Sequence, residues 1–186
     1  MTASGSRFAP ASTIMIASRV PATIRSSSVS VIWLYNRTGD ARLLKLASLL
    51  KQQGFDWQAL FANYPYRTKT TKAAIGMDKP DTPGAVPQGL KDPALSVHGV
   101  NNAQGLKASP VWSVISGDAN DRQAVHRQLG ELDRYHGLPI GIYSADEHLA
   151  GRSPSQGVEM WAIVGAMYSL EHALAMFKLR GGGDEE

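Results

Sequence analysis

Residues 137–177 read GLPIGIYSADEHLAGRSPSQGVEMWAIVGAMYSLEHALAMF, and this stretch decides the fold prediction. Its second half carries large apolar side chains at alternating steps of three and four residues, the spacing of one helical face. These are Met160, Ile163, Met167, Leu170, Leu174 and Phe177. Trp161, Val164 and Tyr168 extend the apolar surface to a neighbouring face. We therefore expect a helix that is buried on most sides.

A capping pattern predicts where this helix begins. Ser153 suits the N-cap position, Pro154 suits the first helical position, and Gln156 can close a capping box. Upstream of the cap, residues 140–143 form a short apolar run that favours a strand.

The rest of the chain predicts helices separated by tight turns and one long loop. We expect helices over about 30–38, 41–53, 96–115 and 120–136, and a loop rich in proline and glycine over 63–93. Gly39 can end the first helix in a left-handed conformation and Asp40 can cap the second, so these two helices should form an antiparallel hairpin. Pro110 predicts a kink in the third helix.

Apolar helices alternate with amphipathic ones in this pattern, which is typical of the inner and outer layers of a helical toroid or solenoid. The chain ends soon after an apolar helix, so we expect an incomplete toroid cut from something larger. The predicted domain covers residues 30–177, and residues 178–186 form a frayed tail. Residues 1–29 are rich in Ser and Ala and contain no acid. This composition fits an organellar transit peptide, a disordered tail or a non-homologous start.

Composition excludes several classes of function. The net charge is +3, but residues 1–29 contain three arginines, which leaves 16 basic and 16 acidic residues elsewhere. Charge therefore gives no support for nucleic-acid binding. The chain has no cysteine, which excludes disulfides, cysteine nucleophiles and thiolate metal sites within it. No run of 18 uncharged apolar residues is present, so we expect no membrane span.

Three carboxylates flank the start of the apolar helix. Asp146 and Glu147 precede it, and Glu159 lies inside the apolar run. A buried carboxylate is costly unless it is paired, binds metal or is protonated for chemistry. The simpler alternative is that Glu159 bonds a neighbouring loop while Glu147 is solvated. His98 offers the same choice between a structural histidine and part of a polar pocket.

Three segments carry a family resemblance: VIWLYNRTGDARLLKLASLLKQQGFDW, HGVNNAQGLK and YSADEHLAGRSPSQGVEMWAIVGAMYSLEH. They resemble glycoside hydrolase family 127, the beta-L-arabinofuranosidase-like group. The resemblance implies an all-α domain of helical hairpins that is part of an (α/α)6 barrel. It also implies cleavage of L-arabinofuranosides with retention, through a covalent intermediate on a zinc-bound cysteine thiolate.

The resemblance also implies roles for individual residues. Glu147 matches the general acid/base, and Glu159 matches a zinc ligand, but Trp161 stands where a cysteine ligand would be. His98 matches a histidine that contacts the sugar, and Tyr143 and Asp146 are further candidate substrate contacts. Since the cysteine nucleophile is missing, we expect this chain alone to be an inactive fragment.

Two alternatives come from other classes of function. One is a non-catalytic carbohydrate-binding remnant that uses His98, Tyr143 and Glu147 without turnover. The other is a helical scaffold that self-associates through an uncovered inner helix. The sequence leaves the cellular location open, with the cytoplasm favoured over the transit-like interpretation.

Overall fold

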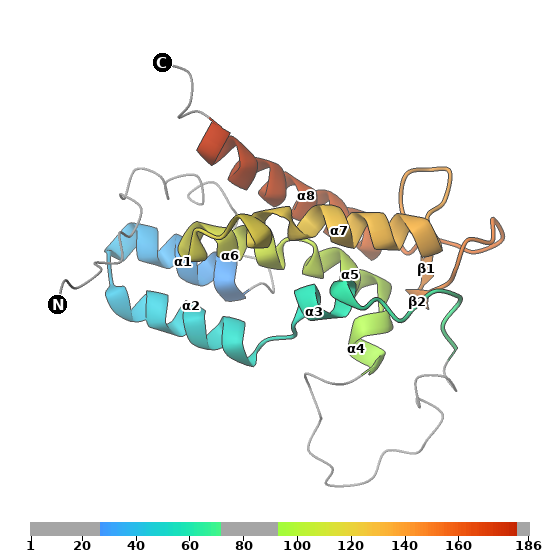
Figure 1. Cartoon of the computed structure of the whole chain (residues 1–186), viewed down its shortest axis with the longest axis horizontal. Coiled ribbons are helices and arrows are strands. Elements are labelled where there is room, and N and C mark those ends of the chain that lie inside the picture. The colour runs from blue at the N-terminus through green and yellow to red at the C-terminus, as the bar shows by residue number, and fades with distance from the viewer. Residues whose placement is uncertain (1–26, 72–92, 182–186) are drawn as a thin grey trace, which may run out of the picture.

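A computed structural model describes residues 27–71 and 93–181, and the description below concerns these residues. The transit-like stretch before residue 27, most of the long loop and residues 182–186 lie outside them. The described part is mostly helical, with one pair of two-residue strands, which confirms the all-α prediction (Figure 1).

The first helical hairpin is confirmed. Helix α1 (Ser27–Thr38) packs against α2 (Ala41–Gln53), and Gly39 between them has φ +68°. The Asp40 carboxylate caps α2 by accepting from the backbone N–H of Arg42 at 2.9 Å, and it also pairs with the Arg42 guanidinium at 2.6 Å. The turn predicted at these residues therefore forms for the predicted reasons.

Helix α3 (Trp57–Ala62) was not predicted. It begins at Asp56, whose side chain accepts from the N–H of Ala59 at 3.1 Å. Such a short helix has little periodicity to reveal it, so the capping Asp56 was the one available signal. Trp57 and Phe61 project from it into a row of stacked aromatic rings that continues to Tyr64.

The single helix predicted over 96–115 is wrong. The chain instead forms α4 (Pro93–Val97), α5 (Gly99–Gly105) and α6 (Ala108–Ser116). His98 interrupts the helix because its backbone is extended and forms a β-bridge with His148. Pro110 lies in the first turn of α6, where backbone N–H groups have no partner within the helix. A proline there breaks no helical hydrogen bond, so the predicted kink is absent.

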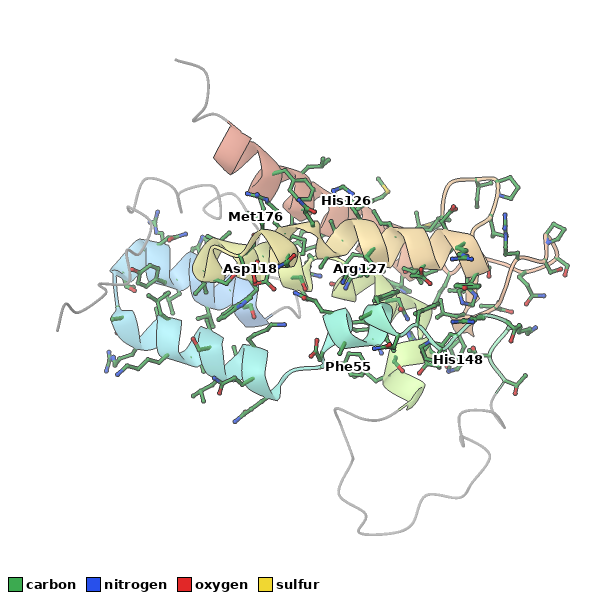
Figure 2. All side chains as sticks on the ribbon, viewed as in Figure 1. Phe55, Asp118, His126, Arg127, His148 and Met176 are labelled. Atoms are coloured by element: carbon green, nitrogen blue, oxygen red, sulfur yellow. The ribbon has the colours of Figure 1, made fainter. Side chains whose placement is uncertain are left out.

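Helix α7 (Ala119–His136) agrees with its prediction to within one residue. Asp118 caps it by accepting from the N–H of Asn120 at 2.8 Å. Its buried face includes Ala124, Val125 and Leu132, and it packs on α6. The ring of His126, labelled in Figure 2, stacks on that of Phe177 in the last helix of the chain, with the ring centroids 5.4 Å apart.

The strand predicted over 140–143 is also wrong. Gly141 has φ +85° and its N–H bonds the carbonyl of Leu138, so this segment is a turn. The strands lie just after it, as β1 (Ala145–Asp146) and β2 (His148–Leu149). They are antiparallel, with Ala145 opposite Leu149 and Asp146 opposite His148.

The last helix, α8 (Met160–Gly181), begins later than the capping pattern predicts and continues into the predicted tail. The N–H of Gln156 bonds the carbonyl of Ser153, but this contact closes only a turn. Residues 157–159 are then held beside β1, because Ala145 bonds the carbonyl of Gly157 and the N–H of Glu159. That pairing keeps the backbone out of a helix until Met160.

The buried face of α8 agrees with the predicted stripe only in part, because Leu170 and Phe177 pack against the core while other members of the stripe are exposed. Met160, Met167 and Leu174 are 68%, 66% and 59% exposed. The buried side chains are the small or polar ones: Ala162, Ala166, Ser169, His172 and Ala173. The reason is the close approach of α5 to α8. A Cβ atom on Gly165 of α8 would lie 3.0 Å from Gln104 Nε2 and 3.1 Å from the Ala103 Cβ, both on α5.

By length and composition, residues Met160–Phe177 of α8 could cross a membrane. Their packing against α5, α6 and α7 also fits a core helix. The absence of a membrane span stays a prediction.

Candidate functional site

Three segments that are distant in sequence meet at one end of the molecule: the start of α5, the β1–β2 hairpin and residues 157–159. His98 forms a β-bridge with His148, and Ala145 forms one with Val158. The N–H of Gly99 donates to the carbonyl of Glu147 at 2.9 Å. These backbone contacts bring the predicted site residues His98, Tyr143, Asp146, Glu147 and Glu159 into one region. His148 marks the hairpin in Figure 2.

Glu147 forms the turn between the two strands in an uncommon conformation. Its φ is +65°, and among the described residues it is the one non-glycine with a positive φ. A side chain in this region costs on the order of 1–3 kcal/mol, and such strain gathers at functional sites. The Glu147 side chain is 62% exposed, which agrees with the simpler alternative given for this carboxylate, that it is solvated. Its Oε2 lies 4.0 Å from His148 Nδ1.

The ring of His148 lies beside this carboxylate, and the ring of His98 packs against that of His148. The rings of His98 and His148 meet edge to face, with their centroids 5.9 Å apart. The Nδ1 atom of His98 is buried and makes no hydrogen bond to the residues that the structure describes. A buried nitrogen without a partner is costly, so His98 has capacity to bind a polar ligand group.

Tyr143 and Asp146 occupy different surroundings. The Tyr143 hydroxyl is buried and donates to the carbonyl of Gly99 at 2.9 Å, and burial raises its pKa. It therefore holds the start of α5 in place and remains protonated at neutral pH. Asp146 is exposed on β1, opposite His148, with its carboxylate open to solvent.

Glu159 ends the extended segment and begins the last helix. Its carbonyl accepts from the N–H groups of Ala162 and Ile163, at 2.9 and 3.2 Å. One carboxylate oxygen, Oε2, is buried and has no hydrogen-bond partner among the described residues. The helix N-terminus nearby favours a negative charge there. The hydrogen bond from Glu159 to strand β1 is made by its backbone N–H, which donates to the carbonyl of Ala145, and not by its side chain.

The residues present do not fit the zinc site that the resemblance implies. Within the described ranges, no group of three His, Cys, Asp or Glu side chains is placed to hold a metal ion. Trp161, at the position of the expected cysteine ligand, is 69% exposed and its indole is not a metal ligand. We derive no chemistry through zinc at this site.

Sequence reasoning missed a buried lysine at the junction of α5 and α6. Lys107 is fully buried, and burial lowers its pKa to about 8. Its Nζ donates to the Gln104 side chain and backbone and lies 5.3 Å from the centre of the Tyr168 ring. No carboxylate in the described part of the chain pairs with it. A lone lysine in a helical sequence gives no signal of burial, because lysines are mostly exposed.

His136, at the end of α7, was missed as well. Its Nδ1 accepts from the N–H of Gly151 at 2.9 Å, and its Nε2 lies 2.8 Å from the carbonyl of Tyr66. The ring therefore carries its proton on Nε2, since a carbonyl can only accept. Burial lowers the pKa of His136, which keeps the ring neutral. Its two hydrogen bonds hold the segments around Tyr66 and Gly151 against the end of α7.

Comparison of the chain with protein-family models, with curated proteins and with solved structures gives no match.

Proposed function

We propose that this chain forms the acid/base side of a sugar site of the family 127 glycoside hydrolase type, with Glu147 as the general acid/base. The observation that carries the proposal is the strained turn at Glu147, which presents an exposed carboxylate beside His148, whose ring in turn meets that of His98. The proposed ligand is an L-arabinofuranoside or a related sugar, as the resemblance implies.

The helix pairs support a matching proposal for the fold. Helix α2 packs on α1, and α7 packs on α6, while α5 and α8 lie against each other. Paired inner and outer helices of this kind build helical toroids. We infer that these pairs are part of an (α/α)6 barrel.

The chemistry sets a limit on what the chain does by itself. Cleavage of a glycosidic bond needs an acid near the leaving oxygen and a nucleophile or activated water on the opposite face. Glu147 can supply the acid, but the chain has no cysteine to act as the nucleophile of this family. We therefore expect sugar binding without turnover.

The test is a titration of the purified full chain with L-arabinose, followed by NMR or calorimetry. Saturable binding is expected, and Glu147→Gln and His98→Ala should each weaken it about tenfold, the loss of one or two polar contacts. Glu171→Gln is the matched control, because Glu171 is an exposed carboxylate on α8 that lies outside the site.

Absence of saturable binding by the unmodified chain would contradict the proposal. Release of arabinose from an aryl L-arabinofuranoside, abolished by Glu147→Gln, would support the acid/base role and overturn the expectation of no turnover.

A second candidate function is self-association through α8. Trp161 and Val164 are 69% and 49% exposed and extend the exposed stripe of Met160, Met167 and Leu174. Contiguous exposed apolar surface commonly marks an interaction site. Sedimentation of the full chain should then show a concentration-dependent oligomer that Trp161→Glu with Met167→Glu dissolves. A monomer at all concentrations would exclude this candidate.

A further inference from the structure

A basic pocket lies beside the loop that follows β2. It has a volume of about 390 Å³ and lies between residues 67–69, the last turn of α7 and residues 150–156. Four cationic side chains line it: Arg67, Lys69, Arg134 and Arg152. No carboxylate is among the lining residues in the described part of the chain.

The residues that line this pocket supply no counter-charge to its four cations. The guanidinium carbons of Arg67 and Arg134 lie 5.8 and 5.3 Å from the centre of the same ring, that of Tyr135. Lys69 Nζ donates to the neutral Gln156 side chain at 2.9 Å. Among the described residues, basic and acidic side chains lie within 4.0 Å of each other only at Arg42–Asp40 and His148–Glu147, and neither pair belongs to the pocket. Grouped like charges repel, and a bound anion would offset that repulsion.

The walls of the pocket are fixed before any ligand arrives. His136 bonds the carbonyl of Tyr66, which precedes the lining residue Arg67, and the N–H of Gly151, which lines the pocket, and it is itself buried in α7. The N–H and the hydroxyl of Thr70 both donate to the carbonyl of Leu149, at 2.9 and 2.7 Å. A preformed site loses less conformational freedom on binding and so binds more tightly.

We propose that this pocket binds an oxyanion, either a phosphate or sulfate group or a carboxylate, held by Arg67, Arg134 and Arg152 with Lys69. Guanidinium groups match the geometry of these anions and make charge-assisted, often bidentate hydrogen bonds to them. The volume falls within the range of small-molecule sites, about 300–1,000 Å³. The proposal does not depend on glycosidase activity.

The experiment titrates the full chain by calorimetry with inorganic phosphate, sulfate and glucuronate in separate arms at constant ionic strength. Saturable binding of at least one anion is expected. Arg134→Gln and Arg152→Gln should each weaken it about tenfold or more, because each removes a charge-assisted hydrogen bond. Binding of phosphate or sulfate alone would identify an ester group, and binding of glucuronate alone would identify a carboxylate.

Arg127→Gln is the matched control. Arg127 lies on α7 like Arg134 and is exposed, but it does not line the pocket (Figure 2). It should leave the affinity unchanged. Circular dichroism checks that each variant is folded, and Arg134→Lys, which keeps the charge, should retain part of the binding.

Two results would overturn the proposal. One is the absence of saturable binding for all three anions up to about 20 mM, because a dissociation constant above that concentration is too weak for a specific site. The other is equal weakening by Arg127→Gln, which would mean that the anion responds to net charge rather than to this pocket.

Discussion

At the scale of single residues, the buried amine of Lys107 makes stability depend on pH. Its pKa is about 8 in the folded chain and about 10.5 in the unfolded one, so the unfolded state holds more protons between these values. The free energy of unfolding therefore rises with pH across this window, by about 2 kcal/mol between pH 7 and 9.5. Chemical denaturation of the full chain at a series of pH values measures this rise.

Lys107→Met should remove the rise and stabilise the chain at pH 7, since it replaces a buried charge by an apolar side chain of similar length. Lys45→Met changes the same residue type on the exposed side of α2 and should keep the rise. Measurement above pH 10 adds the buried Tyr64 and Tyr143, whose raised pKa values oppose the trend. A flat profile for the unmodified chain would show that Lys107 is solvated.

At the scale of elements, the contact between α5 and α8 depends on the absence of side chains. A Cβ on Gly165 would lie 3.0 Å from Gln104 Nε2 and 3.1 Å from the Ala103 Cβ, so a larger residue must push the helices apart. Gly165→Leu should therefore destabilise the chain by about 1–3 kcal/mol, the usual cost of overpacking, as measured by denaturant unfolding.

Gly130 provides the matched control on α7, because a Cβ there would meet nothing within 4 Å. Gly130→Leu should be neutral or stabilise the chain by up to about 1 kcal/mol, since leucine is the better helix former. Equal effects of the two substitutions would show that α5 and α8 are not in close contact.

The same contact explains why the sequence predicted the existence of α8 but not its orientation. Large apolar residues at helical spacing indicate a helix, and their stripe predicts which face of that helix is buried. Burial here is instead decided by how closely two backbones approach, which favours Ala162, Gly165 and Ala166. Periodicity of large residues carries no information about such a contact. The cap at Asp40, by contrast, acts locally, and the helix that it predicts begins where expected.

At the scale of the whole molecule, the candidate site is assembled by backbone pairing between distant segments. The residues His98, Glu147 and Glu159 were predicted individually, but the contacts that join them are the bridges to His148 and Val158 and the bond from Gly99. Bridges of one or two residues leave no period in a sequence, so this assembly could not be predicted. The basic pocket could not be predicted as a whole for the same reason, because its four cations come from three separate segments.

At the turn at Glu147, backbone stability and the presence of the carboxylate favour different residues. Its backbone lies in the left-handed region, where glycine is at ease and a glutamate is strained. Selection for stability alone would favour glycine there, and it would delete the carboxylate in the same step. A library of variants of this chain screened only for thermal resistance would therefore be enriched in variants that lack the Glu147 carboxylate. Engineering of the chain for stability should keep Glu147 unchanged.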